Sequence, residues 1–473
     1  MDLSNFLLMR HEISLVVVFV MMLLYDLFSS DKAKQYFQPF ACILFALHTL
    51  FGFYPASTGA VFEGMYVTEG IHLLIKNILN IGVLLLFLQA NNWLKAPDTV
   101  FKRGEFFVIT LFTLFGMYLM ISSGHFLLFY IGLETASIPL ATMVAFDKYK
   151  HHSAEAGAKY ILIAAFSSGI MLYGISMLYG ATGALYFVDL APKLTSSPMI
   201  LLGLVFFLAG MFFKISMVPF HLWTADVYEG SPTPVTAYLS VVSKGSAAFV
   251  VTILMFQVFK NLAVEWMEIF KWIIVITITI GNLFAIRQNN FKRFLAFSSI
   301  SQAGYILLGV LAGSSMGMTT VVFYILAYLF SNFAAFGVIT AIETRTGKVN
   351  ISDYNGLYQT NPKLSLVLML SLFSLGGIPF FVGFFSKFFI FFAAAQAGYY
   401  VIVFIALLNT IISLYYYLLP IKAMFINENE NPVAPFRTDA YNRLSLVVCV
   451  AGILVVGLIS PIFNYIEQLS FGM

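Results

Sequence analysis

The stretch GMFFKISMVPFHLW (residues 210–223) places a lysine, a proline and a histidine inside one long apolar run. Apolar runs of this kind are typical of helices that cross a membrane. A charged side chain at the centre of such a helix costs about 2.5–3.5 kcal/mol on insertion scales. Pro219 also removes a backbone donor and interrupts the hydrogen-bond ladder. The stretch therefore predicts a broken transmembrane helix that holds Lys214 in apolar surroundings for a reason other than stability.

The composition assigns most of the remaining chain to the membrane as well. Of 473 residues, 60% are hydrophobic and only 10% are charged, whereas soluble proteins carry about 25% charged residues. The net charge of +3 and the absence of phosphate-binding glycine motifs give no support for nucleic-acid or nucleotide binding. Cys42 and Cys449 lie far apart, outside any C-x-x-C pair. We therefore expect an all-α integral membrane protein without its own iron–sulfur or covalent haem site.

Fourteen stretches are long and apolar enough to be spans, since crossing requires roughly 20 apolar residues. They are 12–29, 36–53, 71–91, 105–122, 124–146, 157–181, 199–228, 234–257, 266–286, 294–312, 317–343, 364–397, 399–425 and 442–466. Connections after odd-numbered spans are rich in Lys and Arg, and the opposite side carries only Arg10, Lys193, Lys260 and Lys271. By the positive-inside rule both termini lie on the outer side.

The chain repeats itself. The segment YILIAAFSSG (160–169) returns as YILAYLFSNF (324–333), five spans later. Because this offset of five spans is odd, the two copies enter the membrane from opposite sides, which predicts two inverted repeats formed by spans four to eight and nine to thirteen. The corresponding spans seven and twelve both contain a proline, Pro219 and Pro379. We divide the chain into N-terminal helices (1–104), a first repeat (105–257), a second repeat (258–425) and a C-terminal helix (426–473).

Four ionisable residues lie near the middle of predicted spans: Glu134, Lys214, Lys244 and Lys387. One explanation is a static Glu134–Lys214 ion pair, but such pairs rarely stabilise, and two lysines would remain unpaired. We favour a proton path instead, because burial favours the neutral amine while a nearby carboxylate favours the ammonium. His221, beyond the break, is a candidate bridge along this path.

Other polar residues admit simpler explanations. Glu69, His72 and Lys76 share one helical face at the outer end of span three, where we expect solvent or another subunit to contact them. Asp226 and Glu229 lie at the inner end of span seven. They either collect protons or cap and pack helices, and we favour capping and packing.

Several segments resemble the antiporter-like subunits of respiratory complex I. These are FKISMVPFHLWTADVYEGSPTPVTAYLS (213–240), YIGLETASIPL around Glu134, KYILIAAFSSGIMLYGISMLYGATG from Lys159, and GGIPFFVGFFSK ending at Lys387. The likeness covers almost the whole chain and is strongest to the N-type members, similar to the mitochondrial and chloroplast subunit 2 proteins. It implies that Glu134, Lys214, Lys244 and Lys387 form a proton path.

The resemblance also implies a setting. The chain would be a subunit of an NADH–quinone oxidoreductase with no redox centre or NADH site of its own, and flavin, iron–sulfur clusters and quinone would belong to partner subunits. M-type and small K-type subunits would be its neighbours. It would lie in the bacterial inner membrane with both termini periplasmic, or alternatively in an organellar energy-transducing membrane. A Mrp-type cation/proton antiporter and a non-pumping scaffold subunit remain alternatives.

Overall fold

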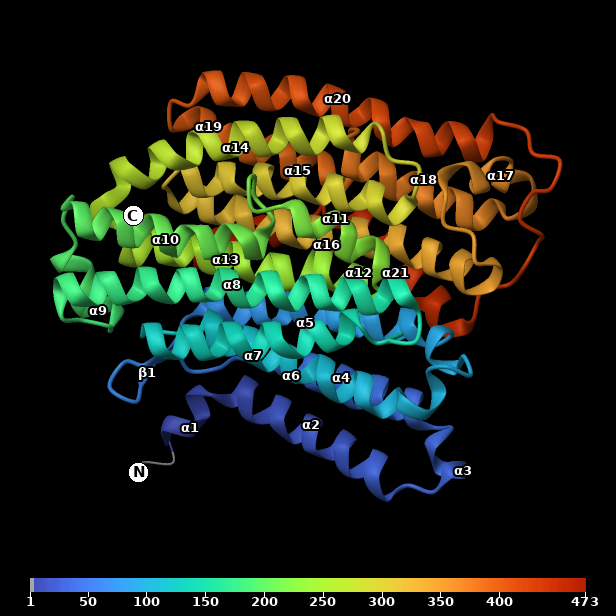
Figure 1. The fold of residues 1–473 in the computed structure, drawn as a ribbon, viewed down its shortest axis with the longest axis horizontal. Coiled ribbons are helices and arrows are strands. Elements are labelled where there is room, and N and C mark those ends of the chain that lie inside the picture. Colours follow the sequence, from blue (N-terminus) through green and yellow to red (C-terminus); the bar gives the residue numbers. More distant parts are fainter. Residues whose placement is uncertain (1–3) are drawn as a thin grey trace.

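The computed structural model describes residues 4–473 and is built almost entirely of helices lying roughly along one direction (Figure 1). A short hairpin of β1 (Gly59–Val61) and β2 (Tyr66–Thr68) lies at the end that also holds α1 (Ser4–Leu8) and the C-terminus. The short helices α3 (Asp31–Lys34) and α17 (Leu357–Thr360) lie at the opposite end. Helices satisfy their own backbone donors and acceptors, as a segment in lipid must.

The other α-helices follow in chain order. They are α2 (Arg10–Phe28), α4 (Phe37–Gly52), α5 (Gly70–Ala90), α6 (Arg103–Ile121), α7 (Phe126–Val144), α8 (His151–Thr182), α9 (Phe187–Leu190), α10 (Pro198–Ile215), α11 (Leu222–Gly230), α12 (Thr233–Tyr238), α13 (Lys244–Ile253), α14 (Ala263–Ala285), α15 (Phe291–Leu311), α16 (Ser315–Thr346), α18 (Pro362–Gly376), α19 (Val382–Gln396), α20 (Tyr400–Phe425), α21 (Ala440–Val455) and α22 (Ser460–Leu469).

Within the described residues, 11 helices are long and apolar enough to cross a membrane, or 12 if α21 and α22 count as one bent span. The apolar helices α4, α18 and α19 are shorter. The all-α architecture is thus confirmed, while the count of fourteen stays a prediction. The last predicted span is not straight, because the chain turns by 84° between α21 and α22, where Pro461 lies in the first turn of α22.

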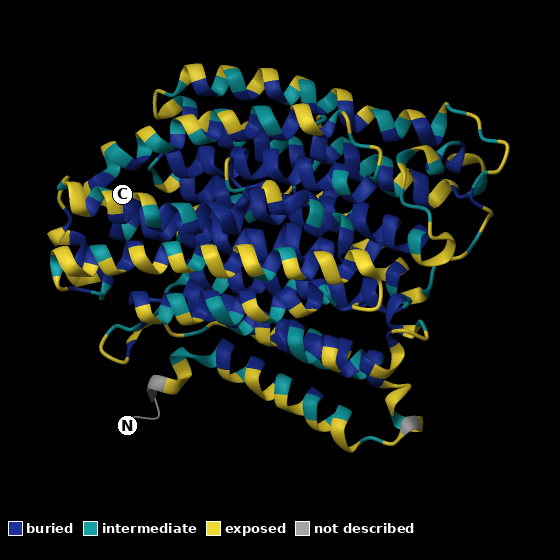
Figure 2. Ribbon diagram, in the orientation of Figure 1, coloured by how far each residue is buried: buried dark blue, intermediate teal, exposed yellow. Residues whose placement is uncertain are grey.

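Burial divides the helices into two groups (Figure 2). The helices α15 and α16 are covered on all sides over their apolar stretches, whereas only about a third of the apolar stretches of α8, α14 and α20 is buried. Helices that are apolar all round belong in the interior of a bundle. The outer helices present exposed apolar side chains, among them Phe166 and Phe404, which suits contact with lipid.

Two of the predicted spans are interrupted, as the prolines indicate. The helix α10 ends at Ile215 and α11 begins at Leu222, and α18 ends at Gly376 before α19 begins at Val382. The residues that follow α10 and α18, Ser216 and Gly377, both have left-handed backbone angles. Each thereby lets its N–H bond back to the last carbonyls of the helix, which closes the helix end.

Several local features recur at a fixed spacing along the chain. Both α8 and α16 contain 32 residues, and each ends at a left-handed glycine, Gly183 or Gly347. An isolated antiparallel bridge joins the residue before α7 to the connection after α8, and another joins the residue before α15 to the connection after α16. In the packing, α6 lies against α7 as α14 lies against α15.

Candidate proton path

Lys214 lies in the last turn of α10, just before the first break, and it is buried. Its Nζ donates to Ser137 Oγ on α7 at 2.7 Å and to Tyr160 OH on α8 at 3.4 Å. The carbonyls at a helix C-terminus carry partial negative charge, which favours a cation there. The break therefore positions the amine between three helices and leaves it bound to neutral oxygens.

Glu134 and Lys214 line the same small cavity, which is large enough for about one water molecule. Within the described residues they form no direct ion pair, and Glu134 Oε1 is buried without a hydrogen-bond partner. A static pair would place the two groups in contact. The geometry thus differs from the tight pair that would fix helix packing, and it suits an interaction across a water molecule.

Lys244 is the first residue of α13 and is buried near the centre of the bundle. It directly follows a π-helical turn, Leu239–Ser243, a feature frequent at functional sites. Its Nζ donates to Ser299 Oγ at 2.9 Å and to the Ser299 carbonyl at 3.2 Å. The same amine lies 5.8 Å from the ring centroid of Tyr228.

Aromatic rings fill the space between these two lysines. The Tyr160 ring is 5.3 Å from that of Trp223, and Trp223 is 6.3 Å from Tyr228. Trp223 and Tyr228 both come from α11, the helix that follows the break. The second half of the broken helix thus connects the surroundings of Lys214 with those of Lys244.

Lys387 lies beyond the second break and binds the helix that precedes it. Its Nζ donates to the carbonyls of Leu375 and Gly376 at 2.8 and 3.2 Å. These are the last residues of α18, whose carbonyls have no partner within the helix. The ring of Tyr305 lies 5.2 Å from the amine. The lysine of α19 therefore binds across the break to the end of α18.

A polar cavity continues from Lys387 toward the centre of the bundle. Tyr324 and Tyr328 on α16 and Gln302 on α15 line it together with Lys387. Tyr324 OH donates to Gln302 Oε1, and Gln302 Nε2 donates to Tyr417 OH at 3.1 Å. Tyr328 OH is 3.0 Å from Ser240 Oγ, in the π-helical turn before Lys244.

None of these uncharged polar residues was predicted from the sequence. A signal was present in FSSISQAGY (297–305), which places three serines, a glutamine and a tyrosine in a helix that is buried all round. Such residues facing a bundle interior mark hydrogen bonds between helices.

His221 is buried in the turn before α11, but its Nδ1 has no hydrogen-bond partner within the described residues. It therefore forms no observed link between Lys214 and Lys244. Its predicted role as a bridge stays a prediction.

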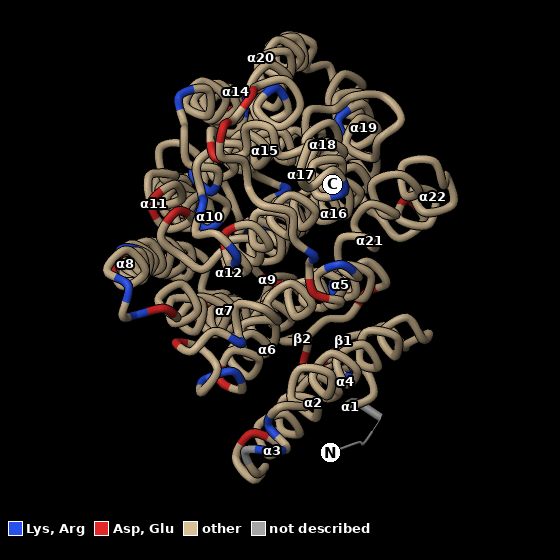
Figure 3. The backbone as a smooth tube through the Cα atoms, turned by 90° about the vertical axis from the view of Figure 1, so that its right-hand side faces the viewer, with Lys and Arg blue, Asp and Glu red and all other residues tan. Residues whose placement is uncertain are grey.

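Charges gather around an open cavity at the end that carries α3 and α17, which Figure 3 views along the helices. Arg293 Nη1 on α15 donates to Asp226 at 2.7 Å and to Glu229 at 3.0 Å, both on α11. Lys159 on α8 lies 3.0 Å from Asp226. These ion pairs join three helices, which agrees with the packing role favoured for Asp226 and Glu229.

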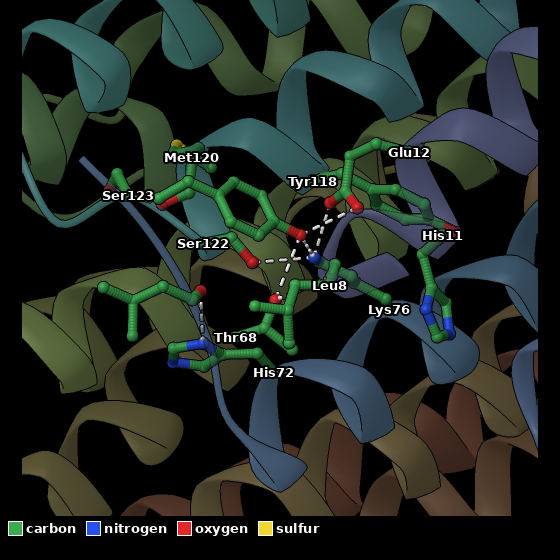
Figure 4. A network of polar contacts seen from close by, with 12 residues as sticks. Leu8, His11, Glu12, Thr68, His72, Lys76, Tyr118, Met120, Ser122 and Ser123 are labelled. Carbon is green, nitrogen blue, oxygen red and sulfur yellow. Dashed lines mark hydrogen bonds and ion pairs between the residues drawn. The ribbon is translucent and has the colours of Figure 1, made fainter. Parts of the chain in front are cut away.

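A second buried polar network lies among the N-terminal helices (Figure 4). Lys76 Nζ on α5 is 2.5 Å from Glu12 Oε1 on α2, and the side chains are 0% and 2% exposed. Tyr66 OH donates to Glu12 Oε2 at 2.8 Å, and Ser122 Oγ accepts from Lys76 at 2.7 Å. His72 is buried nearby. The expectation that solvent or another subunit contacts Lys76 and His72 was wrong, because both side chains are buried within the chain itself. Glu12, Tyr66 and Ser122 surround the Lys76 amine.

No group of three or more His, Cys, Asp or Glu side chains that would suit a metal occurs in residues 4–473. Both cysteines are buried and unpaired.

Comparison with known proteins identifies the family. The family model described as "NADH:quinone oxidoreductase/Mrp antiporter, TM" matches residues 123–413. NADH-quinone oxidoreductase subunit N of Phocaeicola vulgatus is 58% identical over 469 residues, covering 99% of both chains. A chain of respiratory complex I from Thermus thermophilus is 28% identical, with a TM-score of 0.79 over 96% of this chain and 98% of that one.

A chain of the Mrp complex from Dietzia has a similar fold, with a TM-score of 0.84 at 20% identity over 99% of this chain and 97% of that one. At 20% identity this likeness shows the fold alone, whereas the likeness to subunit N extends along the whole sequence. The chain therefore belongs to the family of NADH-quinone oxidoreductase subunit N, the antiporter-like membrane subunits of complex I.

Proposed function

We propose that this chain translocates protons across the membrane as a subunit of NADH-quinone oxidoreductase, driven by electron transfer in partner subunits. Protons pass through Glu134, Lys214, Lys244 and Lys387. The observation that carries the proposal is the setting of the three lysines, each buried and hydrogen-bonded to neutral oxygens. Such amines are expensive to keep in apolar surroundings, and their cost is explained if they gain and lose protons.

The geometry suggests how the relay operates. When Glu134 is ionised, its charge across the small cavity favours the ammonium form of Lys214. When Glu134 is neutralised or shielded, burial favours the neutral amine, and the proton of Lys214 is released. Water and hydroxyl groups then transfer it toward Lys244. From there Ser240, Tyr328 and the polar cavity lead to Lys387.

We further propose that the chain forms fourteen spans in two inverted repeats. Fourteen is reached if α4 crosses the membrane, if α18 and α19 cross as one broken span, and if α21 and α22 form another. The equal lengths and glycine ends of α8 and α16, and the matching isolated bridges, support repeats at residues 105–257 and 258–425. Residues 1–104 and 426–473 then flank the pair of repeats.

The proposal also includes the setting of the chain. It lies in the inner membrane of a bacterium, with the α3 and α17 end in the cytoplasm and both termini in the periplasm, because the Lys and Arg residues favour that orientation. Its neighbours are M-type and small K-type subunits. Flavin, iron–sulfur clusters and quinone belong to partner subunits. The fold shared with the Mrp complex keeps a cation/proton antiporter as the alternative function.

Inverted membrane vesicles containing the whole complex provide the test. Lys214→Ala and Glu134→Ala are expected to lower the number of protons taken up per NADH oxidised, measured with a pH-sensitive dye. Lys271→Ala is the matched control, because this lysine pairs with Glu268 at the bundle surface. Unchanged proton uptake in both variants would remove these residues from the path. NADH-independent sodium–proton exchange by the isolated chain would favour the antiporter function.

A further inference from the structure

An open groove of about 730 Å³ lies between α18, α21 and the connection that precedes α21. Lys363, Arg437 and Arg443 form its polar rim, and no acidic residue lines it. All three side chains are exposed. Within the described residues none of the three lies within ion-pair distance of a carboxylate. The rim therefore concentrates positive charge that the chain itself does not neutralise.

Below this rim the groove is apolar. Val367 on α18 faces it together with Leu446, Val447 and Val450 on α21. Val447 is 61% exposed although it lies in the middle of an apolar helix. The same groove thus combines cations at its mouth with an apolar wall that continues along the helices.

The mouth of the groove is held in place by Asn361, the residue before α18. Its Nδ2 donates to the carbonyls of Val433 and Ala434, each at 3.2 Å, and its Oδ1 accepts from the N–H of Phe436 at 3.1 Å. These bonds fix the connection next to Arg437 against the start of α18. Lys363 lies on α18 and Arg443 on α21, and the bonds of Asn361 fix the connection that carries Arg437.

We propose that this groove binds an anionic phospholipid, with its phosphate among the three basic side chains and an acyl chain along α21. Basic pockets between transmembrane helices on the cytoplasmic side suit anionic headgroups, and the Lys and Arg bias assigns this end of the bundle to the cytoplasm. A soluble phosphate would contact only the basic rim, whereas a phospholipid would also cover the exposed apolar wall with its acyl chain. The inference is independent of the proton path, since none of its residues belongs to that path.

The test uses the intact complex in phosphatidylcholine nanodiscs that contain a phosphatidylglycerol probe with a photoreactive acyl chain. We expect the probe to label peptides from α18 and α21. Each basic residue near an anionic headgroup contributes roughly fivefold in affinity. Lys363→Gln is therefore expected to weaken labelling roughly fivefold, and the Lys363→Gln/Arg437→Gln/Arg443→Gln variant on the order of 100-fold.

Arg345→Gln is the matched control, because this exposed arginine lies in the last turn of α16 at the same side of the bundle but outside the groove. It is expected to leave labelling unchanged. Three results would overturn the proposal: equal labelling by a photoreactive phosphatidylcholine, full labelling of the triple variant, or crosslinks from these peptides to another subunit in place of lipid. Proton uptake in the triple variant reports separately on the proposed function.

Discussion

Glu12→Gln would test whether the buried Glu12–Lys76 pair holds the N-terminal helices to the bundle. The substitution keeps the size of the side chain and removes its charge. Lys76 would retain Ser122 Oγ at 2.7 Å and Tyr66 OH at 3.3 Å as partners. It would lose the carboxylate at 2.5 Å, leaving an ammonium with 0% exposure beside neutral groups only.

The expected loss follows from this burial. Removing one partner of a buried ion pair costs about 3–5 kcal/mol, because the other charge remains desolvated. The two remaining acceptors favour the lower end, about 3 kcal/mol. Local opening of α2 and α4 should then become roughly 100-fold more frequent, since each 1.4 kcal/mol is about a factor of ten.

The chain contains its own probes for this opening. Cys42 lies on α4, which packs against α2 and α5. Cys449 lies on α21, which is not one of the N-terminal helices. Both thiols are buried, so a maleimide reacts only after the surrounding helices open. In Glu12→Gln the labelling rate at Cys42 should rise roughly 100-fold, while that at Cys449 stays constant.

A double variant provides the control for this reasoning. Glu12→Leu/Lys76→Met removes both charges and should return Cys42 labelling close to the wild-type rate, because apolar replacement of a buried pair is often neutral. An unchanged Cys42 rate in Glu12→Gln would show that the pair does not hold these helices. An equal rise at Cys449 would show global instead of local unfolding.

Two further substitutions test the proposed proton path around Lys244 and Lys387. Ser299→Ala removes the hydroxyl that accepts a hydrogen bond from Lys244, and such a bond to a charged group is worth about 1.5–3 kcal/mol. We expect proton uptake per NADH in vesicles to fall, while the rate of NADH oxidation with an added ionophore stays near that of the wild type. Gln302→Leu breaks the link between Tyr324 and Tyr417 and should slow proton uptake in the same assay. Unaltered proton stoichiometry in either variant would place that residue outside the path.

The sequence predicted both breaks because Pro219 and Pro379 lie in corresponding spans of the two proposed repeats and each lacks a backbone donor. The helices on either side of them do separate, whereas α7 and α20 continue through Pro139 and Pro420. The buried lysines were also predictable, since a lysine within an apolar run of helical length has no route to the surface.

The partners of Lys214 and Lys244 could not be predicted, because they come from helices distant in the chain. Ser137 is 77 residues from Lys214, and Ser299 is 55 residues from Lys244. The clearest failure is Lys76, for which contact with solvent or another subunit was expected at the outer end of a span. Its partner Glu12 is 64 residues away, and only the fold, in which α2 packs against α4 and α6, shows that the pair is buried.

Lys76 differs from Lys214, Lys244 and Lys387 in the type of oxygen that accepts its hydrogen bonds, and this difference distinguishes a structural lysine from the proposed transport lysines. Lys76 binds a carboxylate at 2.5 Å, and such a charge-assisted bond is roughly twice as strong as one between neutral groups, so the ammonium is held permanently. Lys214 and Lys244 bind serine hydroxyls, and Lys387 binds backbone carbonyls. Neutral acceptors stabilise the ammonium enough to form it but leave the neutral amine tolerable in the same apolar surroundings. A relay requires sites that exist in both forms, and only the lysines without a bound carboxylate meet that requirement.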